Sequence, residues 1–312
     1  MTEEIAEVEH QEEGKIPPEN RSIFGILFFS PQERRLRAGW RLALQALVLA
    51  VFVLGMQFIV RYYLYANNPS LGNYDYYISR FITLLGITGS VYVARVIIDD
   101  RSFPSLGLFL DAKAGRDFGV GLGISFLMAG LIFLAGWALG WVDFRDFAWN
   151  ATIPQSFTLF WFVFLALFLT TAWQEELLFR GYWLKNIKDG LNIFWAVGIS
   201  SVGFAAMYFL NPNYTIPGLV GLLILGLFYG YAAFSSKRLW LPLGLHLGWK
   251  LFQGNVFGFR VSGLQVPGII IQQTQGPGLW TGGRFGPEAG LLLLPVLILG
   301  TFLVWLYTSS EG

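Results

Sequence analysis

The sequence contains no cysteine and only two histidines, His10 and His246. The absence of cysteine excludes disulfides, zinc–thiolate sites, thiol nucleophiles and cysteine-ligated iron–sulfur clusters. Two histidines are too few for a multi-histidine metal site, and we expect neither a metal nor another cofactor. The sequence has no Walker-type loop, Gly-x-Ser-x-Gly turn or His-Glu-x-x-His helix, so nucleotide hydrolysis, serine hydrolysis and a zincin site lack support.

Charged residues are also scarce. They make up 13% of the 312 residues, whereas a soluble domain carries roughly 25%. Fourteen of the 41 charged side chains fall within residues 1–41, and 54% of the whole chain is hydrophobic. We therefore expect most of the chain to be surrounded by lipid. The net charge is +1 and no basic block lies outside the N-terminal segment, which excludes a nucleic-acid partner.

Eight stretches of the chain are long and apolar enough to cross a bilayer as helices. This pattern predicts an all-α, polytopic transmembrane bundle of about eight spans. Residues 1–38 are predicted to form a cytoplasmic tail that is disordered or interfacial, and residues 39–312 to form the transmembrane domain. The expected spans lie near 40–60, 77–98, 118–142, 157–184, 191–210, 217–235, 239–258 and 288–307.

The orientation follows from the positions of lysine and arginine around these spans. Fourteen of these residues lie on the side of the N-terminal segment and five on the opposite side. The positive-inside rule then predicts that both termini are cytoplasmic. The first span follows some forty residues, so we expect it to stay in the mature multi-pass protein rather than act as a cleaved signal.

A few ionisable residues lie inside the expected spans. A charged side chain is costly there, so it is found mainly where it is paired with an opposite charge or has a function. Glu176 and Arg180 are four residues apart, the spacing and order of an intrahelical ion pair, so we interpret them as structural. The residue four positions after Glu175 is Phe179, so Glu175 has no ion-pair partner on its own helix and is free to face a cavity. His246 is the only histidine within a span.

Two further pairs share the spacing of one helical turn. His246 and Lys250 are four residues apart on one expected span, and Phe204 and Tyr208 are four apart on another. Three helices therefore each offer one polar face.

In this order the motifs resemble the CAAX protease and bacteriocin-processing family of glutamate-dependent intramembrane endopeptidases. The family pattern is Glu-Glu-x-x-x-Arg, then Phe-x-x-x-His, then His-x-x-x-Asn or Asp. Glu175, Glu176 and Arg180 match the first motif, while Phe204 and His246 match the starts of the others. The likeness covers about residues 155–290, which include Asn211-Pro212, Gly244-Leu245-His246 and Phe285-Gly286-Pro287-Glu288.

The resemblance implies that Glu175 is the general base that activates water and that His246 stabilises the oxyanion. The sequence departs from the pattern at Tyr208, where the family has histidine, and at Lys250, where it has asparagine. Tyrosine can donate a hydrogen bond to an oxyanion but is a poor proton acceptor at neutral pH. Lysine can stabilise an oxyanion, yet a cation beside Glu175 makes that carboxylate a weaker base.

Several interpretations stay open at this level. Glu175 is either the general base or a carboxylate neutralised by Lys250, His246 is either a site residue or a hydrogen-bonded core histidine, and Tyr208 is either a site residue or an interfacial tyrosine. The leading hypothesis is a peptidase that cleaves membrane-associated or CAAX-type peptides, in which Tyr208 and Lys250 assist Glu175 and His246 in catalysis. The alternative is an inactive family member that serves as a membrane scaffold or assembly partner.

A transporter is a third hypothesis, although we find no paired broken-helix repeat that supports it. The segment 261–287 has no periodicity of its own and is expected to cover a cavity or bind a partner.

Overall fold

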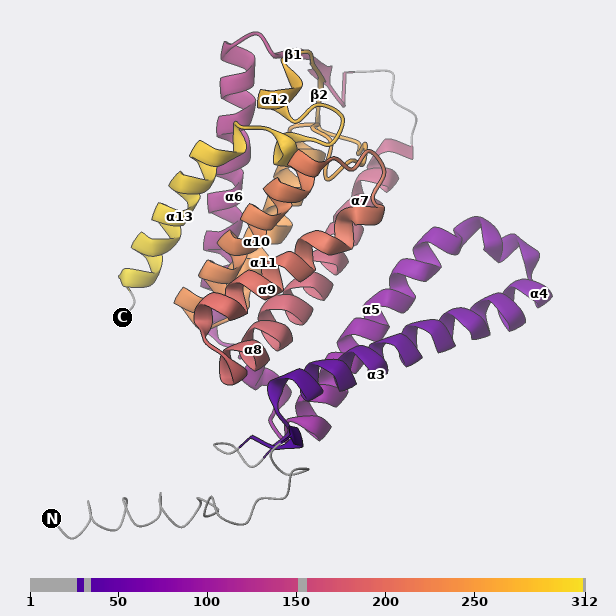
Figure 1. Cartoon of the computed structure of the whole chain (residues 1–312). Coiled ribbons are helices and arrows are strands. Elements are labelled where there is room, and N and C mark those ends of the chain that lie inside the picture. Colours follow the sequence, from indigo (N-terminus) through magenta and orange to yellow (C-terminus); the bar gives the residue numbers. More distant parts are fainter. Residues whose placement is uncertain (1–26, 31–34, 151–155, 311–312) are drawn as a thin grey trace, which may run out of the picture.

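The computed structural model describes residues 27–30, 35–150 and 156–310, and helices dominate this part of the chain (Figure 1). The helical fold class is confirmed. The α-helices are α3 (Ala38–Ile59), α4 (Tyr65–Asn67), α5 (Asp75–Val93), α6 (Ala112–Ala138), α7 (Ser156–Glu175), α8 (Leu184–Gly190), α9 (Ile193–Ala206), α10 (Ile216–Ser236), α11 (Trp240–Lys250), α12 (Gly278–Thr281) and α13 (Leu293–Ser309).

Shorter helical segments of other types interrupt or join these helices. Four are π-helical: η2 (Val60–Leu64), η4 (Ala94–Ile98), η6 (Glu176–Trp183) and η8 (Leu251–Val256). Four are 3₁₀ helices: η3 (Pro69–Tyr74), η5 (Phe103–Leu106), η7 (Met207–Leu210) and η9 (Pro287–Ala289). Each of these π-helical segments directly continues an α-helix, and η6 and η8 continue α7 and α11.

Within the described residues, six helical stretches are long and apolar enough to cross a membrane, which supports an integral membrane protein. They are 38–67, 69–98, 112–138, 157–190, 193–210 and 216–236. The remaining two expected spans correspond to α11 with η8 and to α13, which are shorter. The prediction of about eight spans is therefore approximate.

Helix α11 is the central element of the bundle, and every residue from Leu241 to Lys250 is buried. It packs most closely on α6, because glycines on both helices let the backbones approach. A Cβ on Gly244 would lie 2.2 Å from the carbonyl oxygen of Phe118, and a Cβ on Gly121 would lie 2.6 Å from that of Leu241. Surrounded in this way, α11 can carry polar side chains without presenting them to lipid.

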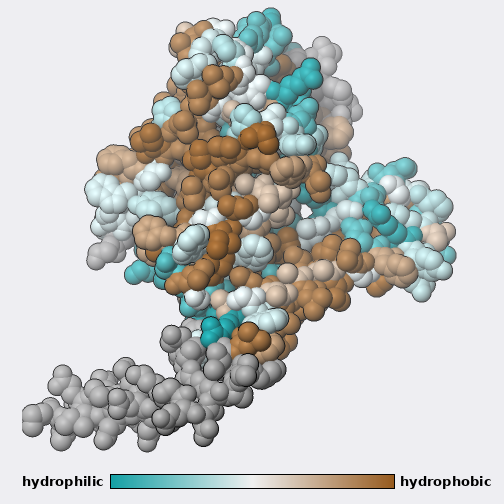
Figure 2. Space-filling view, in the orientation of Figure 1, coloured by the Kyte–Doolittle hydropathy of each residue, from teal (hydrophilic) through white to brown (hydrophobic). Residues whose placement is uncertain are grey.

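Helices α3 and α5 form a long hairpin whose tip points away from the rest of the bundle (Figure 1). The hairpin is fastened at its other end, where α3 contacts α8 and where α5 contacts α7 and η6. The middle of the bundle and the part of the hairpin next to it are largely hydrophobic, whereas hydrophilic residues gather at the upper end and at the tip of the hairpin in Figure 2. This distribution is the one expected for a molecule encircled by hydrocarbon.

The sequence did not reveal a small sheet at the upper end of the molecule. Strand β1 (Val142–Phe147) pairs antiparallel with β2 (Ile270–Thr274), with an irregularity between Phe144 and Asp146. The strand β2 belongs to the segment 261–287, for which no periodicity was expected. Most of the predicted N-terminal tail lies outside the described residues, but Arg35 pairs with Asp189 of α8 at 2.8 Å.

Candidate active site

The structure brings together the residues singled out from the sequence. Glu175 is the last residue of α7 and Glu176 the first of η6, Tyr208 lies in η7, and His246 and Lys250 lie in α11. All five are buried, as is Arg180 of η6. Residues from three separate parts of the chain thus form one polar cluster inside the bundle.

A chain of hydrogen bonds joins Lys250 to Glu175 through Tyr208. The Tyr208 hydroxyl donates to Oε2 of Glu175 at 2.7 Å and accepts from Nζ of Lys250 at 2.9 Å. Within the described part of the chain, Lys250 has no carboxylate within ion-pair distance, so it reaches Glu175 only through this hydroxyl. Tyr208 is 5% exposed and therefore lies in the interior rather than at the lipid interface.

His246 lies between the two carboxylates. Its Nδ1 is 2.8 Å from Oε1 of Glu176, and its Nε2 is 3.5 Å from Oε2 of Glu175. When Nδ1 carries the proton and donates it to Glu176, Nε2 is left as the acceptor that faces Glu175. The sequence had assigned Glu176 only to the pair with Arg180, whose Nη1 lies 3.5 Å from the same Oε1. Glu176 therefore has a second contact, which fixes the orientation of the imidazole.

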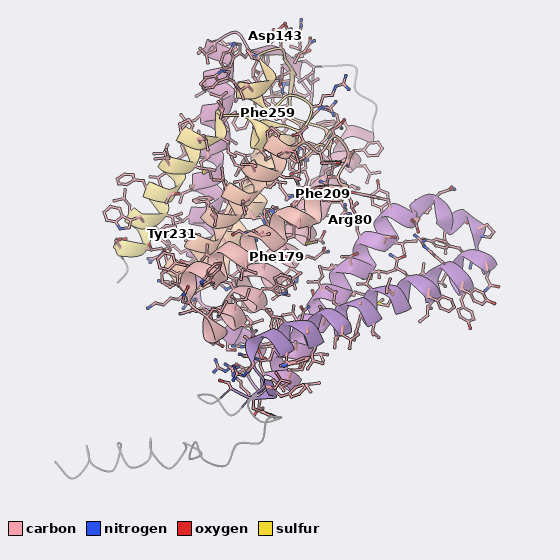
Figure 3. The ribbon with its side chains drawn as sticks, in the orientation of Figure 1. Arg80, Asp143, Phe179, Phe209, Tyr231 and Phe259 are labelled. Atoms are coloured by element: carbon pink, nitrogen blue, oxygen red, sulfur yellow. The ribbon has the colours of Figure 1, made fainter. Side chains whose placement is uncertain are left out.

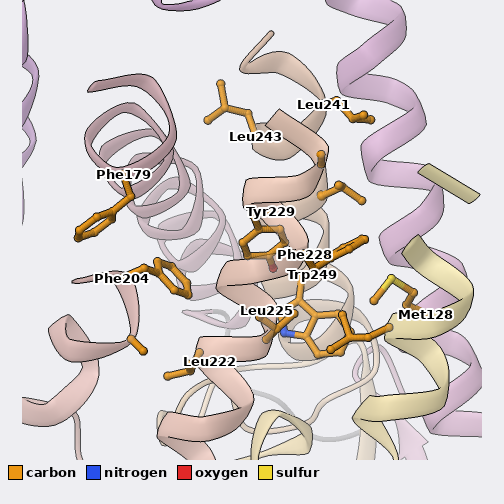
Figure 4. Packing of buried hydrophobic residues seen from close by; sticks show 14 of the residues in the cluster. Met128, Phe179, Phe204, Leu222, Leu225, Phe228, Tyr229, Leu241, Leu243 and Trp249 are labelled. Atoms are coloured by element: carbon orange, nitrogen blue, oxygen red, sulfur yellow. The ribbon is translucent and has the colours of Figure 1, made fainter. Parts of the chain in front are cut away.

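Aromatic rings contact this part of the cluster, among them those of Phe204 and Tyr229, which are labelled in Figure 4. Tyr229 stacks on His246 with ring centroids 4.9 Å apart, and Phe204 meets the imidazole edge to face at 5.6 Å. The guanidinium of Arg180 lies over the Phe204 ring at 4.4 Å and donates to the carbonyl oxygen of Gly226 at 2.9 Å. These contacts hold His246 and Arg180 in place and keep Glu176 away from water.

Glu175, unlike Glu176, lines a small cavity of about 70 Å³. Tyr208 and Lys250 line the same cavity, together with side chains of α5, α7 and the loop after Val261. Oε1 of Glu175 accepts no hydrogen bond from any residue that the structure describes, and it is not sealed from the cavity. A space of this size and polarity can hold a few water molecules beside a carboxylate oxygen.

The sequence argument missed Arg80, which lies on the side of α5 that faces the bundle (Figure 3). Arg80 lines the cavity beside Glu175, and its guanidinium lies 5.3 Å from the centre of the Tyr76 ring. It has no ion-pair partner within the described ranges. In the sequence, Arg80 is one of the five basic residues on the side opposite the N-terminal segment, but it follows the expected start of the span 77–98 by three residues, and that position is the signal that could have found it.

A second polar group supports the loop that borders the cavity. Glu288 accepts from Nε2 of Gln253 at 2.8 Å and from both the backbone N–H and the hydroxyl of Ser262, at 3.0 and 3.1 Å. Glu288 was noticed only as part of a motif, without a role. The contacts fasten the segment after Val261 to η8 and η9, so they position one wall of the cavity.

Among the described residues, no group of three or more histidine, aspartate and glutamate side chains is arranged to hold a metal ion. No curated protein and no solved structure matches the chain. A family model described as type II CAAX prenyl endopeptidase Rce1-like matches residues 157–252, which run from α7 into η8 and include the whole cluster around Glu175 and His246. Over residues 157–252 this membrane protein is therefore similar to the Rce1-like type II CAAX prenyl endopeptidases.

Proposed function

We propose that this protein is an intramembrane endopeptidase in which Glu175 activates a water molecule. The family match points to a CAAX-type membrane protease, whose substrates are membrane-associated peptides or proteins. The observation that carries the proposal is the cavity, because Glu175, Tyr208 and Lys250 all line it and are joined by hydrogen bonds of 2.7 and 2.9 Å. A base, a donor and a cation thus face one water-sized space.

In the proposed reaction, the free Oε1 of Glu175 removes a proton from water held in the cavity. The resulting hydroxide attacks the carbonyl carbon of the scissile peptide bond, and the carbonyl oxygen gains negative charge. Lys250 lies at the same wall and stabilises that oxyanion, with its remaining N–H groups directed away from Tyr208. Glu175 then returns the proton to the departing amine.

His246 positions and supports the base in this scheme. Its Nδ1 contact with Glu176 leaves Nε2 as an acceptor 3.5 Å from Oε2 of Glu175, so in this tautomer His246 orients the site and does not itself donate to the oxyanion. Glu176 and Arg180 act through His246 rather than on the substrate. The substrate is a peptide that reaches the cavity between α5, α7 and the loop after Val261, the elements that border it.

The test is cleavage of membrane-associated peptide precursors, including prenylated CAAX peptides, by the full-length protein reconstituted in vesicles. Replacing the base in Glu175→Gln is expected to reduce cleavage about a hundredfold or more. Asp143→Asn is the matched control, because it removes a half-exposed carboxylate of β1 that is paired with Arg145 far from the cavity and should leave cleavage unchanged. Undiminished cleavage by Glu175→Gln would refute the proposed role.

A specific observation also favours the alternative of an inactive scaffold. Oε2 of Glu175 is occupied by Tyr208, and the buried charges of Glu175, Glu176, Arg180 and Lys250 sum to zero, which suits a structural cluster in lipid. On this hypothesis the wild-type protein cleaves nothing. A Tyr208→His/Lys250→Asn variant, which restores the family pattern, would then gain cleavage.

A further inference from the structure

A basic pocket lies at the opposite end of the bundle from the sheet, where α8 and α10 end. This cavity of about 450 Å³ is formed by the segment around η5, by η6 and α8, and by the turn between α10 and α11. Seven of its lining side chains are basic and one, Asp189, is acidic. The basic side chains are Arg95, Arg101, Arg180, Lys185, Lys188, Lys237 and Arg238.

The one carboxylate that lines the basic pocket does not balance these charges. Asp189 is 2.8 Å from Arg35 and 3.7 Å from Arg41, and neither arginine lines the pocket. Lys188 and Lys237 form no ion pair with any residue that the structure describes, and both are exposed. Arg95, Arg180 and Arg238 are paired with carboxylates that do not line the pocket, namely Asp99, Glu176 and Asp111. The local excess of positive charge therefore comes chiefly from Lys185, Lys188 and Lys237.

Lys185 adds to the excess of positive charge in the basic pocket. Its ammonium donates to the backbone carbonyl oxygen of Ser105 at 2.7 Å, a contact that does not neutralise it. The remaining lining includes apolar side chains such as Phe234, whose ring lies 5.7 Å from Nζ of Lys188. A pocket of this kind offers several cations to one multiply charged group and an apolar wall to whatever carries that group.

We propose that the basic pocket binds a phosphate-bearing anion. Phosphate oxygens accept hydrogen bonds from several cations at once, and a cavity of 450 Å³ holds a phosphate together with part of the molecule that bears it. The phosphate belongs either to the headgroup of an anionic lipid or to a soluble compound. The site is separate from the cavity beside Glu175, so it does not depend on the proposed peptidase activity.

Binding is tested through thermal unfolding of the full-length protein in neutral detergent. In one arm inorganic phosphate is titrated against chloride at equal ionic strength, and in the other phosphatidylglycerol is titrated against phosphatidylcholine in mixed micelles. Because a ligand that binds the folded state stabilises it, the unfolding midpoint rises in at least one arm. A response to phosphate alone identifies a soluble ligand, and a response confined to phosphatidylglycerol identifies a lipid headgroup.

Three variants tie that response to the basic pocket. Lys188→Gln/Lys237→Gln is expected to weaken binding of whichever probe raises the midpoint, phosphate or phosphatidylglycerol, at least about tenfold, because each cation contributes separately to the binding free energy. Lys188→Arg/Lys237→Arg keeps the charge and retains binding. Arg61→Gln/Arg284→Gln removes the same charge from exposed positions outside the pocket and also retains binding. The proposal is overturned if the wild type responds in neither arm, or if the two glutamine variants respond alike.

Discussion

The hydroxyl of Tyr208 is the only group that joins Glu175 to Lys250 within the described structure, so its removal affects both. Tyr208→Phe takes away a donor from the carboxylate and an acceptor from a buried ammonium. We expect this change to lower the free energy of unfolding by about 1–3 kcal/mol, measured by titration with a denaturing detergent. Cleavage should fall in parallel if the site is catalytic.

Tyr229→Phe is the matched control for Tyr208→Phe. The Tyr229 ring also lies against the cluster and is equally buried, but its hydroxyl has no hydrogen-bond partner among the described residues. Removing an unpartnered hydroxyl should leave the free energy of unfolding nearly unchanged. Equal losses in the two variants would show that ring packing, rather than the hydrogen-bonded chain, accounts for the effect.

A second prediction at this scale concerns pH and the pair formed by Asp111 and Arg238 near the ends of α6 and α11. Arg238 donates to both carboxylate oxygens, and the N–H of Ala114 also donates to Asp111. These hydrogen bonds lower the pKa of Asp111 from 3.8 to about 2. Because the folded-state pKa is depressed, the stabilisation is present above the usual pKa and is lost as the pH falls towards about 2.

The measurement is the unfolding midpoint of wild type and Asp111→Asn across this acidic range. The wild type should be the more stable protein near neutral pH, and the difference should shrink as the pH falls. A difference that stays constant with pH would contradict the assigned contribution of the carboxylate.

At the scale of the element, the contact between α6 and α11 gives a prediction with an internal control. A Cβ on Gly244 would lie 2.2 Å from a backbone oxygen of α6, whereas a Cβ on Gly123 has nothing within 4 Å. Gly244→Ala must push the two helices apart, so we expect it to lower the free energy of unfolding by about 1–3 kcal/mol. Gly123→Ala should change it by less than about 0.5 kcal/mol. Similar effects of the two changes would refute the close contact.

The helices were largely predictable, because runs of apolar residues locate spans whatever their neighbours are. The two strands were not, since β1 and β2 are far apart in sequence and each forms only by pairing with the other. The π-helical segments were not foreseen either. They add a residue to the turn and often occur at functional sites, and here η6 begins at Glu176 and η8 follows Lys250.

For the candidate site, too, the features that depend on one helix were predictable and those that depend on packing between helices were not. Spacing within one helix identified the pair of Glu176 and Arg180 and also singled out Tyr208, His246 and Lys250, to which the resemblance then gave roles. The contact between Glu176 and His246 and the place of Arg80 depend on how separate helices pack. Spacing along one helix carries no information about that packing, so these features emerged only in three dimensions.

At the scale of the whole molecule, the orientation in the membrane is still a prediction, and the absence of cysteine makes it easy to test. Asp143 lies at the end with the sheet (Figure 3), and Lys188 is exposed at the end with the basic pocket. With a cytoplasmic N terminus, Asp143→Cys should react with a membrane-impermeant maleimide in intact cells. Lys188→Cys should react only after permeabilisation, and the cysteine-free wild type gives the background. The reverse pattern would invert the proposed orientation.

The central place of α11 has a consequence for how the chain is made. Glu176 enters the membrane on the same helical segment as Arg180, so that ion pair is complete within one span. Glu175 and His246 belong to elements synthesised at different times, because α11 comes after α7, α8, α9 and α10 in the chain. A nascent chain that stops before Trp240 therefore leaves Glu175 in the membrane without Lys250, and Glu176 without its histidine. Arrival of α11 is therefore the step that supplies the last side chains of the cluster around Glu175 and Glu176.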